Sequence, residues 1–421
     1  MITETIQNVN LIIATAFFLL YVYQIFFVLV PFFKKDDPHK KNVIHRFAVL
    51  ISARNEENVI ADLINSLHEQ NYPQDMMDVF VVADNCTDST AETARNAGAI
   101  VYERFNREQV GKGYALDFLI GKIFKRYGKD YYDGFMVFDA DNILDKNYVS
   151  AMNQTFSDGH RIITSYRNSK NYGTNWISAG YALWFLRESK YLNYSRMLMH
   201  TSCAVSGTGF LVHKDIIKKN DGWKCFLLTE DIQFSIKSVI EGETIAYCKD
   251  AVLYDEQPIS FSQSWTQRLR WARGFLQVFA KHGLKLIGTM FKTGRFSCFD
   301  MTMTIMPSIF LSLATFAMNA AAVVMAAHSG EDVSGLLMTA VHWVVNVYWM
   351  VFTLGLITTI TEWDQIHCST GKKILYMFTF PIYLFSYVPI SVIALFKPVK
   401  WEPIKHGNAN TLGEFAKKEI Q

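Results

Sequence analysis

Long apolar stretches lie near both ends of the chain, and a more polar region lies between them. Asn10–Phe33 is nearly uncharged and longer than the roughly 20 apolar residues that a membrane-spanning helix needs. Met301–Ala327 and Leu336–Ile360 have the same character, and Leu375–Phe396 is apolar but contains two prolines. The pattern therefore predicts a multi-pass membrane protein with a polar domain between its first and later spans.

Basic residues orient these spans. Lysines at positions 34, 35, 40 and 41 directly follow the first apolar stretch, whereas residues 1–10 contain no Lys or Arg. By the positive-inside rule, the amino terminus lies outside and the middle of the chain lies in the cytosol. A cleaved signal peptide is the alternative for the first stretch, but no basic region precedes it and no small-residue cleavage site follows. The expected location is the plasma membrane.

The middle of the chain alternates between short apolar runs and helix-like segments, which predicts an α/β domain from Arg46 to about Ala251. The expected strands are Phe47–Ser52, Val79–Ala83, Ile100–Glu103 and Phe135–Phe138. The expected helices are Glu57–Gln70, Thr87–Ala97 and Lys112–Lys125. Such alternation favours a doubly wound, mostly parallel sheet that binds ligands at the carboxyl ends of its strands.

Gly274–Lys292 mixes large apolar residues with lysines, which is typical of a helix in the membrane interface; an ordinary surface helix is the alternative. The expected units are therefore an amino-terminal span with a basic linker, an α/β domain, an interface helix, a membrane or channel region and a cytosolic tail. Their residues are 1–43, 44–273, 274–296, 297–400 and 401–421.

Composition narrows the class of protein. Half of the residues are hydrophobic, 19% are charged, and the formal net charge is +2. This balance argues against a nucleic-acid-binding protein. The six cysteines lie far apart without a Cys-x-x-Cys pair, which excludes a disulfide framework or a cysteine metal cluster and fits reduced thiols in the cytosol.

The first candidate site is an Asp-x-Asp motif, Asp139 and Asp141, directly after the apolar run that ends at Phe138. Mg²⁺ and Mn²⁺ favour oxygen ligands, and Mg²⁺ commonly uses one or two carboxylates together with the phosphates of a substrate. The motif therefore predicts a divalent cation held against a diphosphate. A solvated strand end is the alternative.

The second candidate site is Thr229-Glu230-Asp231, which follows the first by about ninety residues. Either carboxylate could take a proton from a hydroxyl, and a base within reach of that proton typically contributes ~10²–10⁴-fold in rate. A helix N-cap is the alternative for Asp231, with Ile232–Ile240 as the helix behind it. The two roles are compatible, because a cap position would also hold the carboxylate in place.

The third candidate site is a Gln-x-x-Arg-Trp motif. Gln267, Arg270 and Trp271 lie three or four residues apart and would share one face of a helix. Arg270 could neutralise a leaving pyrophosphate, and the indole of Trp271 could stack on a sugar ring. The alternative is an amphipathic helix with a buried Trp.

In this order, the three clusters resemble those of the processive membrane glycosyltransferases of family 2: the cellulose, hyaluronan, chitin and related β-glucan synthases. The resemblance covers nearly the whole chain. It implies a GT-A-like nucleotide-sugar transferase domain fused to transmembrane and interface helices, with Mg²⁺ or Mn²⁺ as cofactor. It also favours Asp231 over Glu230 as the general base of an inverting reaction.

The resemblance implies further binding residues, although capping and turn chemistry is the alternative at each strand-end position. Those for the nucleotide sugar are Ala53, Glu56, Asp84, Lys112, Gln267 and Arg270. Those for the acceptor are Trp271, Gly207 and Thr208. The motif around Gly207 lacks the two Phe that typically begin it in cellulose synthases, which argues against a plain cellulose synthase. Asp255–Pro258 also resembles the family, without an assigned role.

A segment near the carboxyl end resembles a mobile lid that closes over the nucleotide in similar synthases. Its residues are Trp401, Lys405 and His406, and a membrane-anchor motif is the alternative. If Leu375–Phe396 crossed the membrane, this segment would lie outside, far from the nucleotide. Pro381 and Pro389 can each break a helix. We therefore predict that this stretch bends or re-enters and returns the tail to the cytosol.

The resemblance implies a processive, inverting enzyme that adds sugars from a UDP-activated donor to a β-linked chain and passes that chain through the bilayer. UDP-glucose is the favoured donor, and a mixed-linkage (1,3;1,4)-β-glucan or cellulose-like polymer is the favoured product. The alternatives are hyaluronan- or chitin-like synthesis from other UDP-sugars, glycosylation of a lipid carrier, and a pure transporter or channel. The expected partners are the UDP-sugar, the growing polysaccharide and the lipid bilayer, with accessory export proteins left open.

Overall fold

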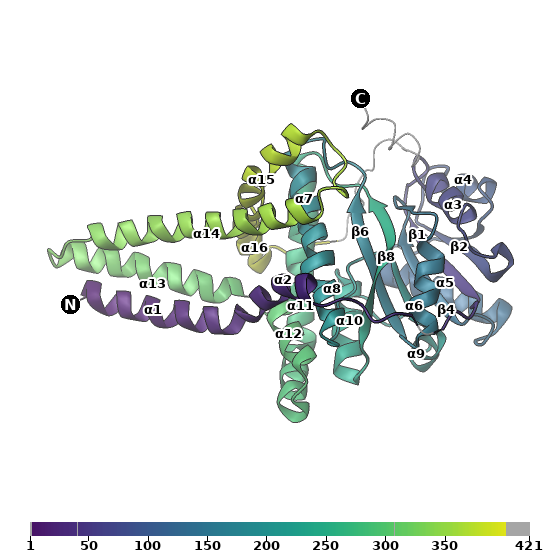
Figure 1. The fold of residues 1–421 in the computed structure, drawn as a ribbon, viewed down its shortest axis with the longest axis horizontal. Helices are drawn as coiled ribbons and strands as arrows, with labels where there is room; N and C mark the ends of the chain where they lie inside the picture. The colour runs from purple at the N-terminus through teal and green to yellow at the C-terminus, as the bar shows by residue number, and fades with distance from the viewer. Residues whose placement is uncertain (1, 40, 307, 401–421) are drawn as a thin grey trace.

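The structure, a computed structural model, describes residues 2–39, 41–306 and 308–400. The candidate lid residues Trp401, Lys405 and His406 lie outside these described residues. A single eight-stranded sheet, with the order β3-β2-β1-β4-β7-β6-β8-β5, forms the centre of the α/β domain (Figure 1). Its strands are β1 (Phe47–Ala53), β2 (Met77–Asp84), β3 (Ile100–Arg104), β4 (Gly134–Asp139), β5 (Ile143–Leu144), β6 (Ile162–Ser169), β7 (Phe210–His213) and β8 (Ile245–Asp255).

The four strands expected from the sequence form the parallel half of this sheet. β1 pairs in parallel with both β2 and β4, and β2 pairs in parallel with β3. Within that register, Ser52 lies beside both Val82 and Asp139, so the carboxyl ends of the strands meet along one edge. The other half is mixed, because β7 runs antiparallel to both β4 and β6 while β6 and β8 are parallel.

Two hydrophobic cores cover the two faces of the sheet, because side chains alternate along each strand. In β1, Phe47, Val49 and Ile51 pack with one set of helices, and Ala48 and Leu50 pack with another. The first set is α3 (Ile60–His68), α4 (Thr90–Asn96) and α6 (Tyr148–Ser157). The second is α5 (Lys112–Tyr127) and α7 (Trp176–Arg187).

Shorter elements complete the α/β domain and connect it to the first helices. They are α2 (Tyr23–Phe33), the 3-10 turn η1 (Gln74–Met76), the π-helical segment η2 (Glu188–Asn193), α8 (Tyr194–Leu198), α9 (Lys214–Lys219) and α10 (Glu230–Glu241). The next helix, α11 (Phe261–Thr293), is 33 residues long and passes without a break through the expected boundary between residues 273 and 274.

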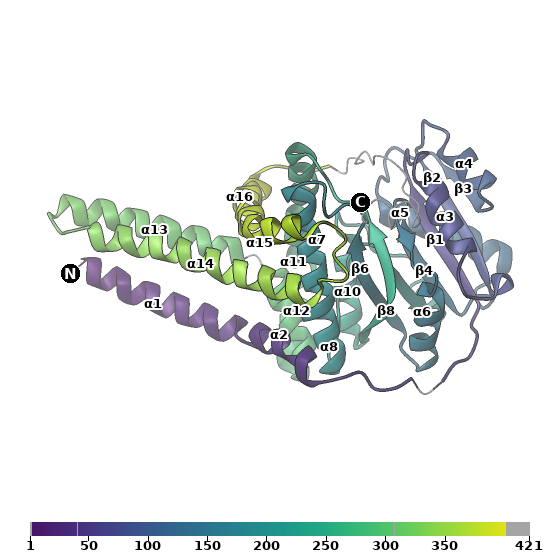
Figure 2. The same ribbon diagram turned by 45° about the horizontal axis from the view of Figure 1, so that its top comes forward.

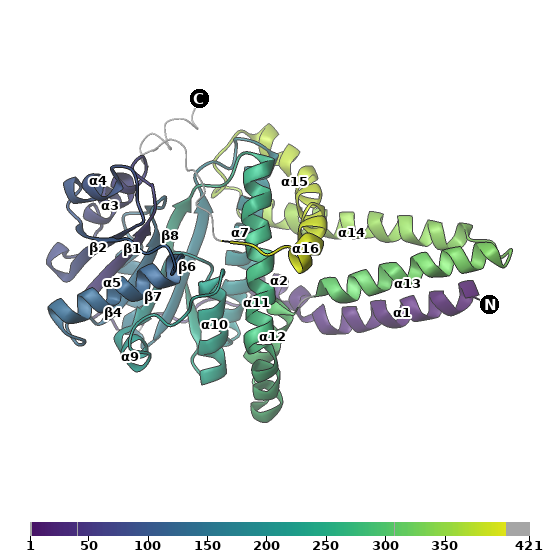
Figure 3. The same ribbon diagram turned by 180° about the vertical axis from the view of Figure 1, so that it is seen from behind.

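Three helices project together away from the sheet, as the views in Figures 1, 2 and 3 show: α1 (Ile2–Tyr21), α13 (Ser308–His328) and α14 (Ser334–Thr361). The remaining helices stay beside the α/β domain, with α11 lying across the base of the projecting group (Figure 3). These are α11, α12 (Phe296–Ile305), α15 (Thr370–Phe385) and α16 (Tyr387–Phe396).

By length and hydropathy, three helical stretches of the described residues are suited to crossing a membrane: Thr3–Phe33, Ser334–Thr361 and Thr370–Phe396. Ser312–His328 is a shorter apolar helix. The last long stretch is divided at the single residue Ser386 into α15 and α16, and the expected bend or re-entry of this stretch stays a prediction.

The expected span Met301–Ala327 is wrong at its start, because Met301–Ile305 belongs to the separate helix α12. The cause is a buried ion pair: Asp300 of α12 bonds Arg196 of α8 at 2.7 Å, which holds this helix against the α/β domain.

Candidate active site

Asp139 ends β4, and Asp141 follows it at the carboxyl edge of the sheet, where the strand pattern predicted them. The backbone N–H of Asp139 donates to Thr208 Oγ1 at 2.9 Å, which attaches this motif to the loop around Gly207. Gly207 has a φ of +79°, and a Cβ there would lie 3.9 Å from Asp231 Oδ2 and 4.0 Å from Asp139 Oδ2. The fold thus brings the first and second candidate sites together around the same glycine.

Lys112, the first residue of α5, reaches the same loop. Its Nζ lies 2.5 Å from Asp139 Oδ1 and donates to the Gly207 carbonyl oxygen at 2.7 Å. Burial alone would lower the pKa of the Lys112 ammonium, but the nearby carboxylates, Asp139 above all, hold it above its usual value. Lys112 therefore stays a cation at the strand end, where a phosphate could meet it.

Glu230 and Asp231 are the first two residues of α10. The N-cap position belongs to Thr229, so Asp231 lies in the first turn of the helix and is not its cap. Burial raises the pKa of both carboxyls, and repulsion by Asp231 helps to bring that of Glu230 to about 7. A raised pKa makes a carboxylate a stronger base, provided that it is ionised.

Gln267, Arg270 and Trp271 line the same cavity from one face of α11. Trp271 is held by edge contacts with Tyr181 and Phe185 of α7, at centroid distances of 5.7 and 6.2 Å. Among the described residues, the buried Oε1 of Gln267 and Nε of Arg270 have no hydrogen-bond partner. Buried polar atoms are normally paired, so unpaired ones in a cavity lining indicate a polar ligand.

Glu56 and Asp84 line the cavity at the ends of β1 and β2. Asp84 forms a buried ion pair with Arg104, with 2.6 Å between Oδ1 and the guanidinium. Burial raises the pKa of Asp84, and Arg104 partly offsets that rise. Ala53 is only 1% exposed and does not line the cavity, and Thr208 is buried beneath Asp139.

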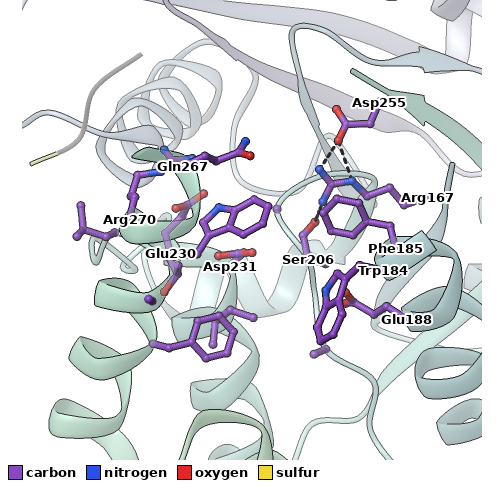
Figure 4. Close-up of a pocket in the computed structure, with 18 of the residues that line it drawn as sticks. Arg167, Trp184, Phe185, Glu188, Ser206, Glu230, Asp231, Asp255, Gln267 and Arg270 are labelled. Carbon is purple, nitrogen blue, oxygen red and sulfur yellow. Dashed lines mark hydrogen bonds and ion pairs between the residues drawn. The ribbon is translucent and has the colours of Figure 1, made fainter. Parts of the chain in front are cut away.

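The sequence analysis noted Asp255 without a role and missed the network that it forms on the opposite wall of the cavity. Arg167 of β6 donates from Nε to Asp255 Oδ2 at 2.9 Å and from a terminal nitrogen to Ser206 O at 3.1 Å. Its guanidinium also lies 3.7 Å from the ring centroid of Phe185. Figure 4 shows this group facing Gln267 and Arg270, with Asp231 between them.

The positive charge of Arg167 keeps the carboxyl of Asp255 ionised. Burial would raise the pKa of Asp255, but the Arg167 charge holds it below its usual value. Both residues lie near the carboxyl ends of their strands, β6 and β8, so the rule that located Asp139 would have located them had those strands been recognised. Asn142 connects the network to the first site, because its Nδ2 donates to Asp255 Oδ1 at 3.2 Å.

These walls enclose one cavity of about 760 Å³. It runs from Asp84 and the strand ends, past Asp231 and Trp271, to Leu354 of α14 and Tyr387 of α16. Its lining at the end away from the sheet is largely aliphatic: Leu192, Leu276, Met303, Ile305, Met306, Leu354 and Leu384. Trp184, Arg187 and Glu188 add polar and aromatic groups there, and Figure 4 shows Trp184 and Glu188 beyond Asp231.

The donor set at the strand end suits a divalent cation. Asp139 and Asp141 offer hard carboxylate oxygens, and the Asp139 side chain is 38% exposed to the cavity. Within the described residues, no group of three or more His, Cys, Asp or Glu side chains could hold a metal. Two carboxylates fit Mg²⁺ or Mn²⁺ where substrate phosphates and water supply the remaining ligands.

The family of the chain follows from its sequence match. Residues 45–274, more than half of the chain, match the family model described as "Glycosyltransferase like family 2". The chain belongs to glycosyltransferase family 2. The matched segment contains all three candidate sites and ends three residues after Trp271.

Three curated relatives of this family 2 member have names that describe a glycosyltransferase or a synthase of a sugar-containing product. "Probable glycosyltransferase YdaM" of Bacillus subtilis (strain 168) is 25% identical over 59% of this chain and 59% of its own. A poly-beta-1,6-N-acetyl-D-glucosamine synthase of Staphylococcus epidermidis is 23% identical over 58% and 60%. A beta-monoglucosyldiacylglycerol synthase of Nostoc sp. (strain PCC 7120) is 25% identical over 62% and 56%. The chain thus spans less than two thirds of their length.

A solved structure shares the fold of nearly the whole chain. It is the mannosyltransferase PcManGT from Pyrobaculum calidifontis in complex with GDP-Man and Mn²⁺, with a TM-score of 0.60 and 15% identity. The match covers 93% of this chain and 99% of that one. The expected GT-A-like α/β domain, joined to a helical region whose apolar helices are long enough to cross a membrane, is therefore confirmed. The narrower subgroup, the processive β-glucan synthases, stays a prediction.

Proposed function

We propose that this family 2 glycosyltransferase moves a hexosyl group from a UDP-sugar to an acceptor hydroxyl with inversion at the anomeric carbon. One observation carries the proposal: a single cavity holds the Asp139 and Asp141 pair, the half-buried carboxylate Asp231 and the indole Trp271. Glu56, Asp84 and Lys112 lie at the sheet end of that cavity, where a nucleotide diphosphate would bind.

In this reaction Asp231 takes the proton of the acceptor hydroxyl as its oxygen forms the new bond to the anomeric carbon. The bond between that carbon and the diphosphate oxygen breaks, and UDP leaves with the electron pair. Lys112 and Arg270 stabilise the negative charge of the leaving group, and Trp271 holds the acceptor sugar face. Asp139 and Asp141 would hold a divalent cation, which would add to the charge neutralisation of the leaving group.

The proposed product is a β-linked polysaccharide, with UDP-glucose as donor and a β-glucan as the polymer. The order of the three sites supports it, and a curated relative is named as a polysaccharide synthase. In this proposal the enzyme is processive and passes the chain outward, and the segment with Trp401, Lys405 and His406 closes over the nucleotide.

The proposed setting is the plasma membrane, with the catalytic domain in the cytosol. Two features support it. α1, α13 and α14 project together, and the amino terminus lies at the same end as the α13–α14 turn, away from the sheet (Figure 1). The lysines that follow α2 lie at the other end, on the side of the α/β domain.

A second candidate acceptor is a membrane lipid, and the cavity lining favours it. Aliphatic side chains suit an acyl or prenyl chain, because burial of apolar surface is the driving force, whereas sugars need hydrogen-bonding partners. The aliphatic arm begins beside Trp271 and ends at α14, so a lipid could place its polar head at Asp231 and its chain along that arm. A curated relative is named as a glucosyldiacylglycerol synthase.

The deciding experiment uses the purified full-length protein in lipid nanodiscs. It would be incubated with Mn²⁺ and, in separate reactions, UDP-glucose, UDP-N-acetylglucosamine or GDP-mannose, with nucleotide release and product size as readouts. A long product that a β-glucan-specific hydrolase degrades supports the polymer, whereas one discrete lipid-extractable product supports the lipid acceptor.

Asp231→Asn is the matched control, since it keeps the size of the side chain and removes its basicity. No nucleotide release from any donor by the wild-type protein, or full activity in Asp231→Asn, would contradict the proposed reaction.

A further inference from the structure

The projecting part of α14 carries a stripe of polar and aromatic residues. Thr339, His342, Asn346, Trp349 and Thr353 recur at alternating spacings of three and four residues, and all five are exposed. This set is called the α14 stripe below. Apolar residues exposed on a membrane helix can face lipid, but a polar stripe at that place needs another explanation.

The α14 stripe lies on the side of the helix away from the rest of the molecule. Leu336, Val351 and Gly355 are buried and mark the packed side. With 3.6 residues per turn, the centre of the stripe lies about 150° around the helix from the centre of that packed side. The stripe therefore lies opposite the buried positions of α14, and no residue of this helix between Leu336 and Val351 is buried.

His342 and Asn346 are the two members of the stripe with unmet hydrogen-bonding capacity. The hydroxyls of Thr339 and Thr353, by contrast, donate to backbone carbonyls four residues earlier, at 2.7 and 2.8 Å. His342 and Asn346 make no hydrogen bond with any residue that the structure describes. An amide left without hydrogen-bond partners in an apolar medium is strongly unfavourable.

Asn346 also stands deep in the segment that would cross a membrane. α14 has 28 residues, and Asn346 follows its first residue, Ser334, by 12 residues or about 18 Å of helix. A hydrocarbon core is about 30 Å thick, so an amide at this depth lies far from both water surfaces. Something other than lipid or water must cover it.

We infer that α14 of a second copy of this chain covers the stripe, which makes the enzyme a homodimer in the membrane. The spacing of the stripe is the heptad seam of a left-handed coiled coil, in which a single Asn favours a parallel pair of helices. Thr, Asn and neutral His each both donate and accept, so the stripe complements itself across a two-fold axis along the helices.

The chain already uses this chemistry inside one copy. Asn10 of α1 and Asn319 of α13 exchange two side-chain hydrogen bonds, of 2.7 and 3.0 Å, between neighbouring projecting helices. In the inferred dimer Asn346 forms the equivalent pair with its own copy. The inference requires α14 to cross a membrane, but it does not depend on which sugar or acceptor the enzyme uses.

The test is disulfide cross-linking of the full-length protein in membranes. Asn346→Cys should yield a species of twice the mass on mild oxidation. The matched control is Val344→Cys, which is 51% exposed, stands two residues away and points to the other side of the helix. Val344→Cys and the wild-type protein, with its six cysteines, should remain single chains. Equal cross-linking of both variants, no cross-link at position 346, or a cross-link to a different polypeptide would overturn the inference.

A second variant measures how much the amide pair contributes to association of the two copies, without introducing a cysteine. Asn346→Leu keeps a side chain of similar size that suits lipid, so the helix should still insert. We expect association to weaken about threefold to tenfold, measured by energy transfer between labelled copies across a series of protein-to-lipid ratios. Nucleotide release from the donor should persist, because Asn346 is remote from the cavity lining. Unchanged association would contradict a role for Asn346 at the interface.

Discussion

At the residue scale, the site depends on charges held around one backbone position. Lys112, Asp139 and Asp231 all border Gly207, whose φ of +79° is costly for residues with a Cβ. Lys112 bonds Asp139 directly. A divalent cation at Asp139 would compete with that contact, and a diphosphate would offer Lys112 a new anionic partner. We therefore expect Lys112 to move toward the donor when metal and nucleotide bind together.

The metal assignment can be tested on Asp141, the more buried of the two carboxylates. Asp141→Ala should lower nucleotide release by about 10²-fold or more, because the leaving diphosphate loses the cation that neutralises it. It should also abolish the uptake of Mn²⁺ that UDP promotes, which electron paramagnetic resonance measures directly.

Asp250→Asn is the control for the metal test, since Asp250 is exposed and does not line the cavity. Normal Mn²⁺ uptake and activity in Asp141→Ala, or full wild-type activity in a chelator, would show that the motif holds no catalytic metal.

The paired carboxyls predict a pH dependence of catalysis. The base Asp231 must be ionised, and burial raises the pKa of its carboxyl above its usual value. The value of kcat/KM, which reports the free enzyme, should therefore fall as the pH drops through that raised pKa. Glu230→Gln removes one of the two negative charges, so the pKa of Asp231 should drop and the acid limb should move to lower pH. An unmoved limb would exclude coupling between the two groups.

The same shift predicts a pH dependence of stability. The pKa of Glu230 is raised from 4.5 to about 7 on folding, so the folded state binds a proton more tightly than the unfolded state. Its contribution to stability is present below about pH 4.5 and is lost as the pH rises toward 7. Glu230→Gln lacks this loss, so its melting temperature relative to wild type should increase between pH 5 and 8. A difference that stays constant over this range would contradict the raised pKa.

At the element scale, α11 determines how closely acceptor and base approach. Gly274 of α11 packs against Thr229, the N-cap of α10, and a Cβ at this glycine would lie 2.5 Å from Thr229 Cγ2. The absence of a side chain thus lets the helix that carries Trp271 lie against the turn that carries Asp231. The sequence motifs identify Asp231 and Trp271 as site residues. Only the packing explains why a glycine stands where their two helices touch.

Gly274→Ala should push these two elements apart. We expect a large fall in kcat and a loss of roughly 1–3 kcal/mol of stability, the usual cost of overpacking a filled site. Gly288→Ala on the same helix is the matched control: no atom lies within 4 Å of its added Cβ, and Ala is the better helix former. The test is to measure kcat and the melting temperature of both variants. Equal values for the two would refute the role of close packing at Gly274.

Sequence pattern was sufficient for the elements that repeat a simple rule. β1 to β4 were recognised because buried parallel strands read as apolar runs, and Asp139 was located because it ends one of them. β7 was not recognised, since it has only four residues and follows a glycine-rich turn. Without β6 to β8, Arg167 had no strand end to mark it, and Asp255 was noted only because Asp255–Pro258 resembles the family, without a role. Ala53 was carried over by resemblance alone, and it is buried in the sheet.

At the scale of the whole molecule, the helices divide into those that project from the α/β domain and those that stay beside it. α15 and α16 form the fourth apolar stretch of the sequence, yet they stay beside the domain with a break at Ser386 (Figures 1 and 2). Both also line the cavity, through Tyr383 and Ser391 among others.

This division predicts the side of the membrane on which each end of the chain lies. If only α1, α13 and α14 cross, the α13–α14 turn is outside, and the end of α16 is on the cytosolic side with the catalytic domain. Asp332 in that turn and Lys397 after α16 are both exposed. A cysteine at position 332 should therefore react with a membrane-impermeant maleimide on intact cells, and one at position 397 should react only after permeabilisation.

The unmodified protein is the baseline for this labelling, because its partly exposed cysteines, Cys86 and Cys368, would lie on the cytosolic side. The same logic applies to Asn408, in the tail that carries Trp401, Lys405 and His406, outside the described residues. Labelling of position 397 from outside would mean that α15 and α16 cross the membrane. The tail would then be separated from the nucleotide, and both the three-span topology and the proposed lid would be wrong.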